Sequence, residues 1–169
     1  MKIQRSLVAC CSALLLPLLL LASYLTAEGP QGSGKKYVCS ETNPGTMCNA
    51  STTCGSVSVP CTVDVKRTAH AASVTPGVSN AKSNKPFCVK VGTTVTWKSS
   101  SKNTGFVLDF GPSSPFEQGT IIGGSDRSVS AVARKAGCYK FSVGACVSGA
   151  IYGMCGNVDT EIIVISDGH

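Results

Sequence analysis

The chain has 169 residues and a formal net charge of +6, and 43% of its residues are hydrophobic. This size suits one domain with a real core plus a tail. The basic residues are scattered and form no stripe interleaved with aromatics, which argues against nucleic acid as a partner.

Residues 1–27 form a predicted secretory signal. Two basic residues open the chain, an apolar run extends from Leu7 to Leu25, and Ala27 supplies a small residue for cleavage. The alternative is an uncleaved anchor, because the apolar run is close to the length that spans a bilayer. We expect cleavage, and therefore a secreted, periplasmic or cell-envelope protein with no stable membrane span.

Residues 28–61 form a predicted lead-in and cysteine-rich extension. The segment begins EGPQGSGKK, which is polar, glycine-rich and typical of a flexible lead-in. Its remainder holds too few apolar residues for a core of its own, so we expect disulfides to stabilise it. Within it, Asn49-Ala50-Ser51 matches the acceptor tripeptide for N-linked glycosylation; from the sequence alone we interpret this as a chance match.

Residues 62–169 have the texture of short strands separated by turns. Val89-Lys90-Val91 and Val95-Thr96-Trp97 alternate apolar and polar residues, which is the period of a half-buried strand. We expect an all-β fold, a Greek-key two-sheet β-sandwich, with a small barrel as the alternative. Strands are predicted over 62–66, 87–91, 93–98, 105–110, 127–134, 138–144 and 160–165. The predicted core consists of Val89, Val91, Val95, Trp97, Val107, Tyr139, Phe141, Ile162 and Val164.

The order of motifs in this region is distinctive. The stretch FCVKVGTTVTW is followed by an Asn/Ser loop, by GFVLDF, by a Gly-Cys-Tyr-x-Phe strand, by a Gly-Met-x-Gly loop and by a closing EIIVI strand. Over about residues 62–166 this order resembles the cupredoxin family, with its plastocyanin- and azurin-type domains. The resemblance implies a Greek-key β-sandwich and, in typical members, a blue copper electron-transfer site.

The resemblance also implies where copper ligands belong. A type 1 site needs two imidazoles, one thiolate and a weak axial thioether. The first histidine falls near Gly105, and an alignment on Cys146 puts the second at Gly149 and the thioether at Met154. A second alignment, on the Tyr-x-Phe strand, puts Val143 at the cysteine position. The chain's two histidines, His70 and His169, match no ligand position in either alignment, so we expect no type 1 copper.

Eight cysteines remain after the signal, which in an exported chain predicts disulfides. We expect a local Cys146–Cys155 bridge, a Cys88–Cys138 bridge, and pairing among the N-terminal four, although sequence alone does not fix connectivity. Those four are Cys39, Cys48, Cys54 and Cys61. The alternative is a soft-metal site for copper on reduced Cys146, Met154 and Cys155.

Three function classes remain open. The favoured one is a module without copper or another cofactor, with a structural role or a role in binding an unknown protein or small molecule. The loop-rich edge around residues 99–118 is the best candidate for a contact surface, through Phe106, Phe110 and Phe116. The alternative is that these residues fold back onto the end of the sandwich. The alternatives are a copper-binding or electron-transfer protein with non-standard ligands, and an exported enzyme. We do not expect an enzyme, because no paired base and nucleophile is recognisable.

Overall fold

A computed structural model of the chain describes residue 40, residues 44–149 and residues 155–166. The described part is all-β, with one short helix, α1 (Pro44–Met47), and one turn of 3-10 helix, η1 (Gly111–Ser113). No helix within it is long and apolar enough to cross a membrane. The described strands are β1 (Cys61–Thr68), β2 (Ala71–Pro76), β3 (Phe87–Lys90), β4 (Thr94–Lys98), β5 (Thr104–Asp109), β6 (Thr120–Gly124), β7 (Val129–Val132), β8 (Gly137–Val147) and β9 (Cys155–Ile165).

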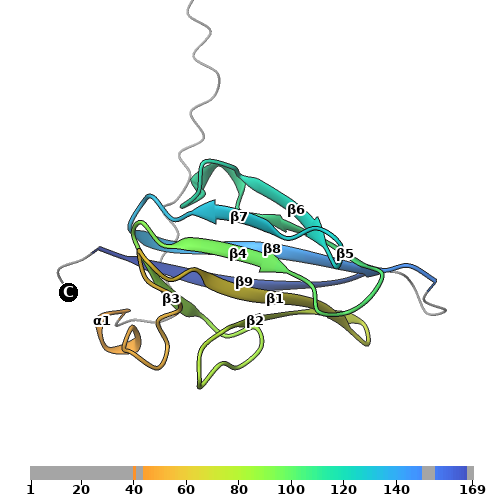
Figure 1. The fold of residues 1–169 in the computed structure, drawn as a ribbon, viewed down its shortest axis with the longest axis horizontal. Coiled ribbons are helices and arrows are strands. Elements are labelled where there is room, and N and C mark those ends of the chain that lie inside the picture. Colours follow the sequence, from red (N-terminus) through yellow and green to blue (C-terminus); the bar gives the residue numbers. More distant parts are fainter. Residues whose placement is uncertain (1–39, 41–43, 150–154, 167–169) are drawn as a thin grey trace, which may run out of the picture. The chain divides into compact units, whose positions relative to one another are not determined.

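The strands pair in the order β6-β5-β8-β9-β2-β1-β4-β7, and β3 also pairs with β9. Figure 1 shows part of this order, with β4 lying between β7 and β1. Two long pairings are parallel, β1 with β4 and β3 with β9, and the link between β2 and β9 is a single parallel residue pair, Ala71 with Asn157. The sheet is therefore nearly continuous but narrow at that link.

The core is centred on Trp97, whose side chain is fully buried. Four phenylalanine rings surround it in edge-on contacts, with ring centroids 5.7–6.4 Å away. Edge-to-face packing of this kind adds to the free energy gained from burial alone. The four rings are those of Phe87, Phe110, Phe116 and Phe141.

Most of the predicted core is confirmed. Val89, Val95, Trp97, Phe141, Ile162 and Val164 are all buried. Val91 and Tyr139 are only partly buried and pack against the cluster from outside. The assignment of Val107 to the core is wrong, because its side chain is 39% exposed while Phe106 and Leu108 on either side are buried. The inward face of β5 is therefore the opposite of the predicted one.

Two strands were missing from the sequence prediction. β2 reads AASVTP and β6 reads TIIGG, and neither alternates clearly. In β6 the glycines resemble a turn, yet a Cβ atom at Gly123 would lie only 2.6 Å from the Phe106 ring. Glycine is needed there because the neighbouring strand's aromatic ring lies directly on the backbone.

Disulfides tie the described part of the extension to the sheet. Cys48 bonds to Cys88 in β3, and Cys54 bonds to Cys61 at the start of β1. The predicted Cys88–Cys138 bridge is therefore wrong, and the N-terminal cysteines do not pair only among themselves. Cys138 is itself disulfide-bonded, and Cys39 lies outside the described residues.

The extension does not stand apart from the sheet, because residues 52–54 run along the free edge of β3. The Cys54 amide donates to the Cys88 carbonyl at 2.8 Å, and the Cys88 amide donates to the Thr52 carbonyl at 3.1 Å. This pairing was hidden in the sequence, since STTC carries no strand-like alternation.

Candidate functional site

The candidate metal centre lies where β5, β8 and β9 run side by side. The register places Gly105 opposite Cys146, and Cys146 opposite Cys155. The predicted Cys146–Cys155 disulfide is present, with a Cα–Cα distance of 4.0 Å. The position expected for the first histidine, the candidate thiolate and its bridging partner thus occupy one row across three strands.

The row faces outward. Gly105 and Cys155 are exposed and Cys146 is partly exposed, whereas Phe106 and Ala145 beside them are buried. Cross-strand neighbours share one face of a sheet, so a side chain at position 105 would extend to the same side as the Cys146 sulfur. A ligand set built on Cys146 would therefore face solvent and not the core.

The second alignment puts the cysteine position at Val143, which lies in the core. Val143 is 1% exposed and lies opposite Leu108, which is fully buried. Both side chains are aliphatic and neither can coordinate a metal. The inward register thus has the enclosure that a blue copper centre requires but none of the donor atoms.

The soft-metal alternative needs Cys146 and Cys155 as free thiolates, and the structure has them joined in a disulfide. Sulfur held in a disulfide is not a thiolate, so Cys146 and Cys155 cannot coordinate as anions in this state. His70 is exposed in the turn between β1 and β2. Across the described ranges, no three His, Cys, Asp or Glu side chains form a cluster able to hold a metal ion. Met154 and His169 lie outside the described residues.

The three phenylalanines of the candidate contact surface are buried and not exposed. Phe106, Phe110 and Phe116 are 4%, 5% and 4% exposed, and all three belong to the hydrophobic core. Phe110 stacks on Phe141 with ring centroids 4.5 Å apart, and Phe116 packs edge-on against Trp97. The loop folds back onto the sheets, so its aromatic side chains are not available to a partner.

A hollow of about 470 Å³ lies between the 110–114 loop and the start of β8. Two of its polar side chains are engaged within the chain. The Tyr139 hydroxyl donates to the Lys135 carbonyl at 3.0 Å, and Lys140 pairs with Asp159 at 3.0 Å. Burial raises the pKa of Tyr139 above its ordinary value, so this phenol is not a base at neutral pH.

Two carboxylates have lowered pKa values for structural reasons. Partial burial alone would raise the pKa of Asp64, but the hydrogen bonds from Lys66 and Ser100 outweigh it and the pKa lies below the ordinary value. The Ser142 hydroxyl and the Lys140 ammonium group lower the pKa of Asp159. A carboxylate held ionised by hydrogen bonds is a weak general base. Each of the two accepts a hydrogen bond from a serine hydroxyl, Ser100 for Asp64 and Ser142 for Asp159, and both pairs are exposed to solvent.

Sequence reasoning missed one polar group. Glu161 is only 7% exposed in β9, and the Ser40 hydroxyl donates to its carboxylate at 2.8 Å. The sequence gives no warning of this contact, because the two residues are 121 positions apart.

Comparison of the chain with protein-family models, with curated proteins and with solved structures finds no match. The assignment of a function therefore depends on the geometry and chemistry of this chain.

Proposed function

We propose that this protein is an exported, disulfide-stabilised, cupredoxin-like module without type 1 copper, and that it has a structural or binding role and no catalytic one. The observation that carries the proposal is the row formed by Gly105, Cys146 and Cys155. A glycine and a disulfide stand where the resemblance calls for an imidazole and a thiolate.

The strand pairing supports the family and the two-sheet arrangement. β3, β9, β8, β5 and β6 pair in one run, and β2, β1, β4 and β7 pair in another. Among the described residues, only the Ala71–Asn157 pair joins the two runs. The chain crosses between these two sets of paired strands after β2, β3, β4, β6 and β7. Repeated crossing of this kind is typical of a Greek-key sandwich.

The disulfides support export. Three bridges join described cysteines, and such bonds persist in oxidising compartments and are rare where thiols are kept reduced. In this proposal the Cys146–Cys155 bridge holds the β8–β9 hairpin in place of a metal. The hairpin then contributes stability and not electron transfer.

Copper titration tests the proposal. Purified oxidised protein receives Cu(II), and the visible spectrum is recorded; we expect no intense thiolate-to-copper band. The same titration with Cu(I) follows after treatment with a dithiol, and the control is the double variant C146S/C155S. A strong band in the oxidised protein, or Cu(I) binding that the control abolishes, would favour the copper-handling alternative.

A further inference from the structure

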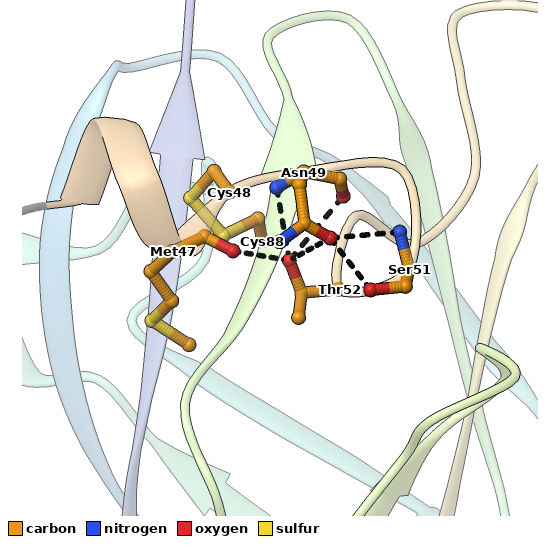
Figure 2. Close-up of a disulfide and its surroundings, with 6 residues drawn as sticks. All are labelled: Met47, Cys48, Asn49, Ser51, Thr52 and Cys88. Atoms are coloured by element: carbon orange, nitrogen blue, oxygen red, sulfur yellow. Dashed lines mark hydrogen bonds between the residues drawn. A yellow bond between two sulfur atoms is a disulfide. The ribbon is translucent and has the colours of Figure 1, made fainter.

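The turn that follows α1 presents a single asparagine side chain to solvent. Figure 2 shows this turn, with Met47, Asn49, Ser51 and Thr52 beside the Cys48–Cys88 disulfide. Asn49 is exposed. Its tripeptide Asn49-Ala50-Ser51 has a hydroxyl two residues after the asparagine and no proline between them, a pattern that no other asparagine in the chain has. From this and the geometry below, we propose that Asn49 is an acceptor site for N-linked glycosylation.

The geometry of the tripeptide supports this role. The Ser51 backbone amide donates to Asn49 Oδ1 at 2.9 Å, and the Ser51 hydroxyl donates to the same oxygen at 2.6 Å. A backbone N–H can only donate, so the atom facing Ser51 must be the amide oxygen and not the nitrogen. Two donors on Oδ1 polarise the amide, and they engage the oxygen while leaving Nδ2 out of both bonds.

The nitrogen is the atom that must react. No described residue accepts a hydrogen bond from Asn49 Nδ2, so the amide donates to solvent. In the transfer step, Nδ2 bonds to the anomeric carbon of an oligosaccharide carried on a lipid pyrophosphate. The bond from that carbon to the pyrophosphate oxygen breaks, Nδ2 loses one proton, and the lipid pyrophosphate leaves with the electron pair. No atom changes oxidation state.

The surrounding turn holds the acceptor without burying it. The backbone N–H of Asn49 donates to the Thr52 hydroxyl at 3.0 Å, and the backbone N–H of Thr53 donates to the backbone carbonyl of Asn49 at 2.9 Å. The Thr52 hydroxyl also donates to the Met47 carbonyl. None of these three bonds uses Asn49 Nδ2, so a sugar on that nitrogen costs the turn none of them.

The neighbouring disulfide does not block the reaction. Cys48 bonds to Cys88, which lies 40 residues later. During synthesis Asn49 therefore enters the compartment before the bridge can close, and the nascent chain is open to the transferase. Removing the bridge is expected to leave glycan occupancy unchanged.

This inference rests on the export proposed above, and the experiment separates the two. The full chain, behind a known secretory signal, is translated with rough microsomes, and translocated molecules are identified by their resistance to added protease. We expect one glycan on the translocated wild-type chain, removed by a glycan-releasing amidase that leaves aspartate at position 49. A parallel translation without the added signal tests export separately.

The variants are matched to the turn. N49Q and S51A are expected to lose the glycan completely, S51T to keep it, and N84Q, which alters an asparagine outside the tripeptide, to keep it. Gly105→Ser gives Asn103 a hydroxyl two residues later and serves as a positive control, since a Cβ atom at position 105 meets nothing closer than 3.9 Å. A translocated wild-type chain without glycan, while Gly105→Ser gains one, would overturn the proposal. Retention of the shift in N49Q would also overturn it.

Discussion

At the scale of single residues, the face that a side chain occupies on β5 decides its contribution to stability. Leu108 is fully buried, whereas Val107 next to it is 39% exposed. The two positions are adjacent in one strand, so they share backbone context and differ mainly in burial. They form a matched pair for measuring what the core of this sheet contributes.

The first prediction compares Leu108→Ala with Val107→Ala. Leu108→Ala removes buried methyl groups and leaves a cavity, so it should lower the free energy of unfolding by about 2–5 kcal/mol. Val107→Ala should change it by less than about 1 kcal/mol, as is usual for exposed positions. Urea denaturation of both variants measures the difference. A larger effect at Val107 would show that the assigned inward face of β5 is wrong.

The second prediction concerns Asp64, whose carboxylate holds the turn after β4. It accepts hydrogen bonds from the Ser100 amide and hydroxyl, each at 2.8 Å, and pairs with Lys66 at 2.8 Å. Its folded pKa is lowered, so its contribution is complete above the unfolded value of about 3.9 and is lost as the pH falls through the folded value.

The variant D64N should therefore be less stable than the wild type near neutral pH. The gap in unfolding free energy should shrink as the pH falls from about 6 to about 2, because the wild-type carboxylate is protonated over that range. Urea unfolding at several pH values measures the gap. A gap that stayed constant over the whole range would mean that the charge of Asp64 plays no part.

At the scale of elements, the link between β2 and β9 is the narrowest part of the sheet. A Cβ atom at Gly156 would lie 2.5–2.8 Å from backbone atoms of Ala71, closer than Cβ atoms come to other heavy atoms in proteins. Backbone atoms of two paired strands cannot move apart cheaply. Glycine at this position thus permits the one residue pair that joins the two runs of strands.

Gly156→Ala should consequently destabilise the protein by about 1–3 kcal/mol, through forced separation of β2 and β9. Gly105→Ala is the control, because it also lies in a strand and has open space around it. The control should be neutral or stabilising by up to about 1 kcal/mol, since alanine restricts the unfolded chain. Equal effects of the two substitutions, measured by thermal or urea unfolding, would contradict the close approach at Gly156.

The β8–β9 hairpin supplies a further element-scale prediction. The Cys146–Cys155 bridge closes a short loop and should contribute about 2–3 kcal/mol, mainly by restricting the unfolded chain. The variant C146S/C155S should melt roughly 5–10 °C lower while keeping its β-sheet circular dichroism. An unchanged melting temperature would show that the bridge does not stabilise the hairpin.

At the scale of the whole molecule, the sequence indicated the all-β class and much of the core, because alternation in FCVKV, TVTWK and YKFSV is a local property. It failed at β2 and β6, where short or glycine-bearing segments gain their strand character from neighbours and not from their own pattern. The prediction of the inward face of β5 was wrong for a related reason. Phe106, Val107 and Leu108 are all apolar, so the sequence does not show which of them point into the core.

The features of the candidate site were also predictable only in part from the sequence. The missing histidines and the Cys146–Cys155 pair were visible in the sequence, since they depend on residue identity and short spacing. The Cys48–Cys88 bridge and the contact between Ser40 and Glu161 were not, because both join residues that only the folded chain brings together. Phe106, Phe110 and Phe116 were candidates for a contact surface because composition alone does not show whether a strand end and the loop after it pack onto the core.

The central claim is that the cysteines after residue 27 are bonded to one another and not available to a metal. Mass mapping tests it most directly, on protein isolated without reductant, alkylated at once and digested without reduction. The account predicts linked peptides for Cys48–Cys88, Cys54–Cys61 and Cys146–Cys155, with no alkylated cysteine after residue 27. Stoichiometric alkylation of both Cys146 and Cys155 would contradict it.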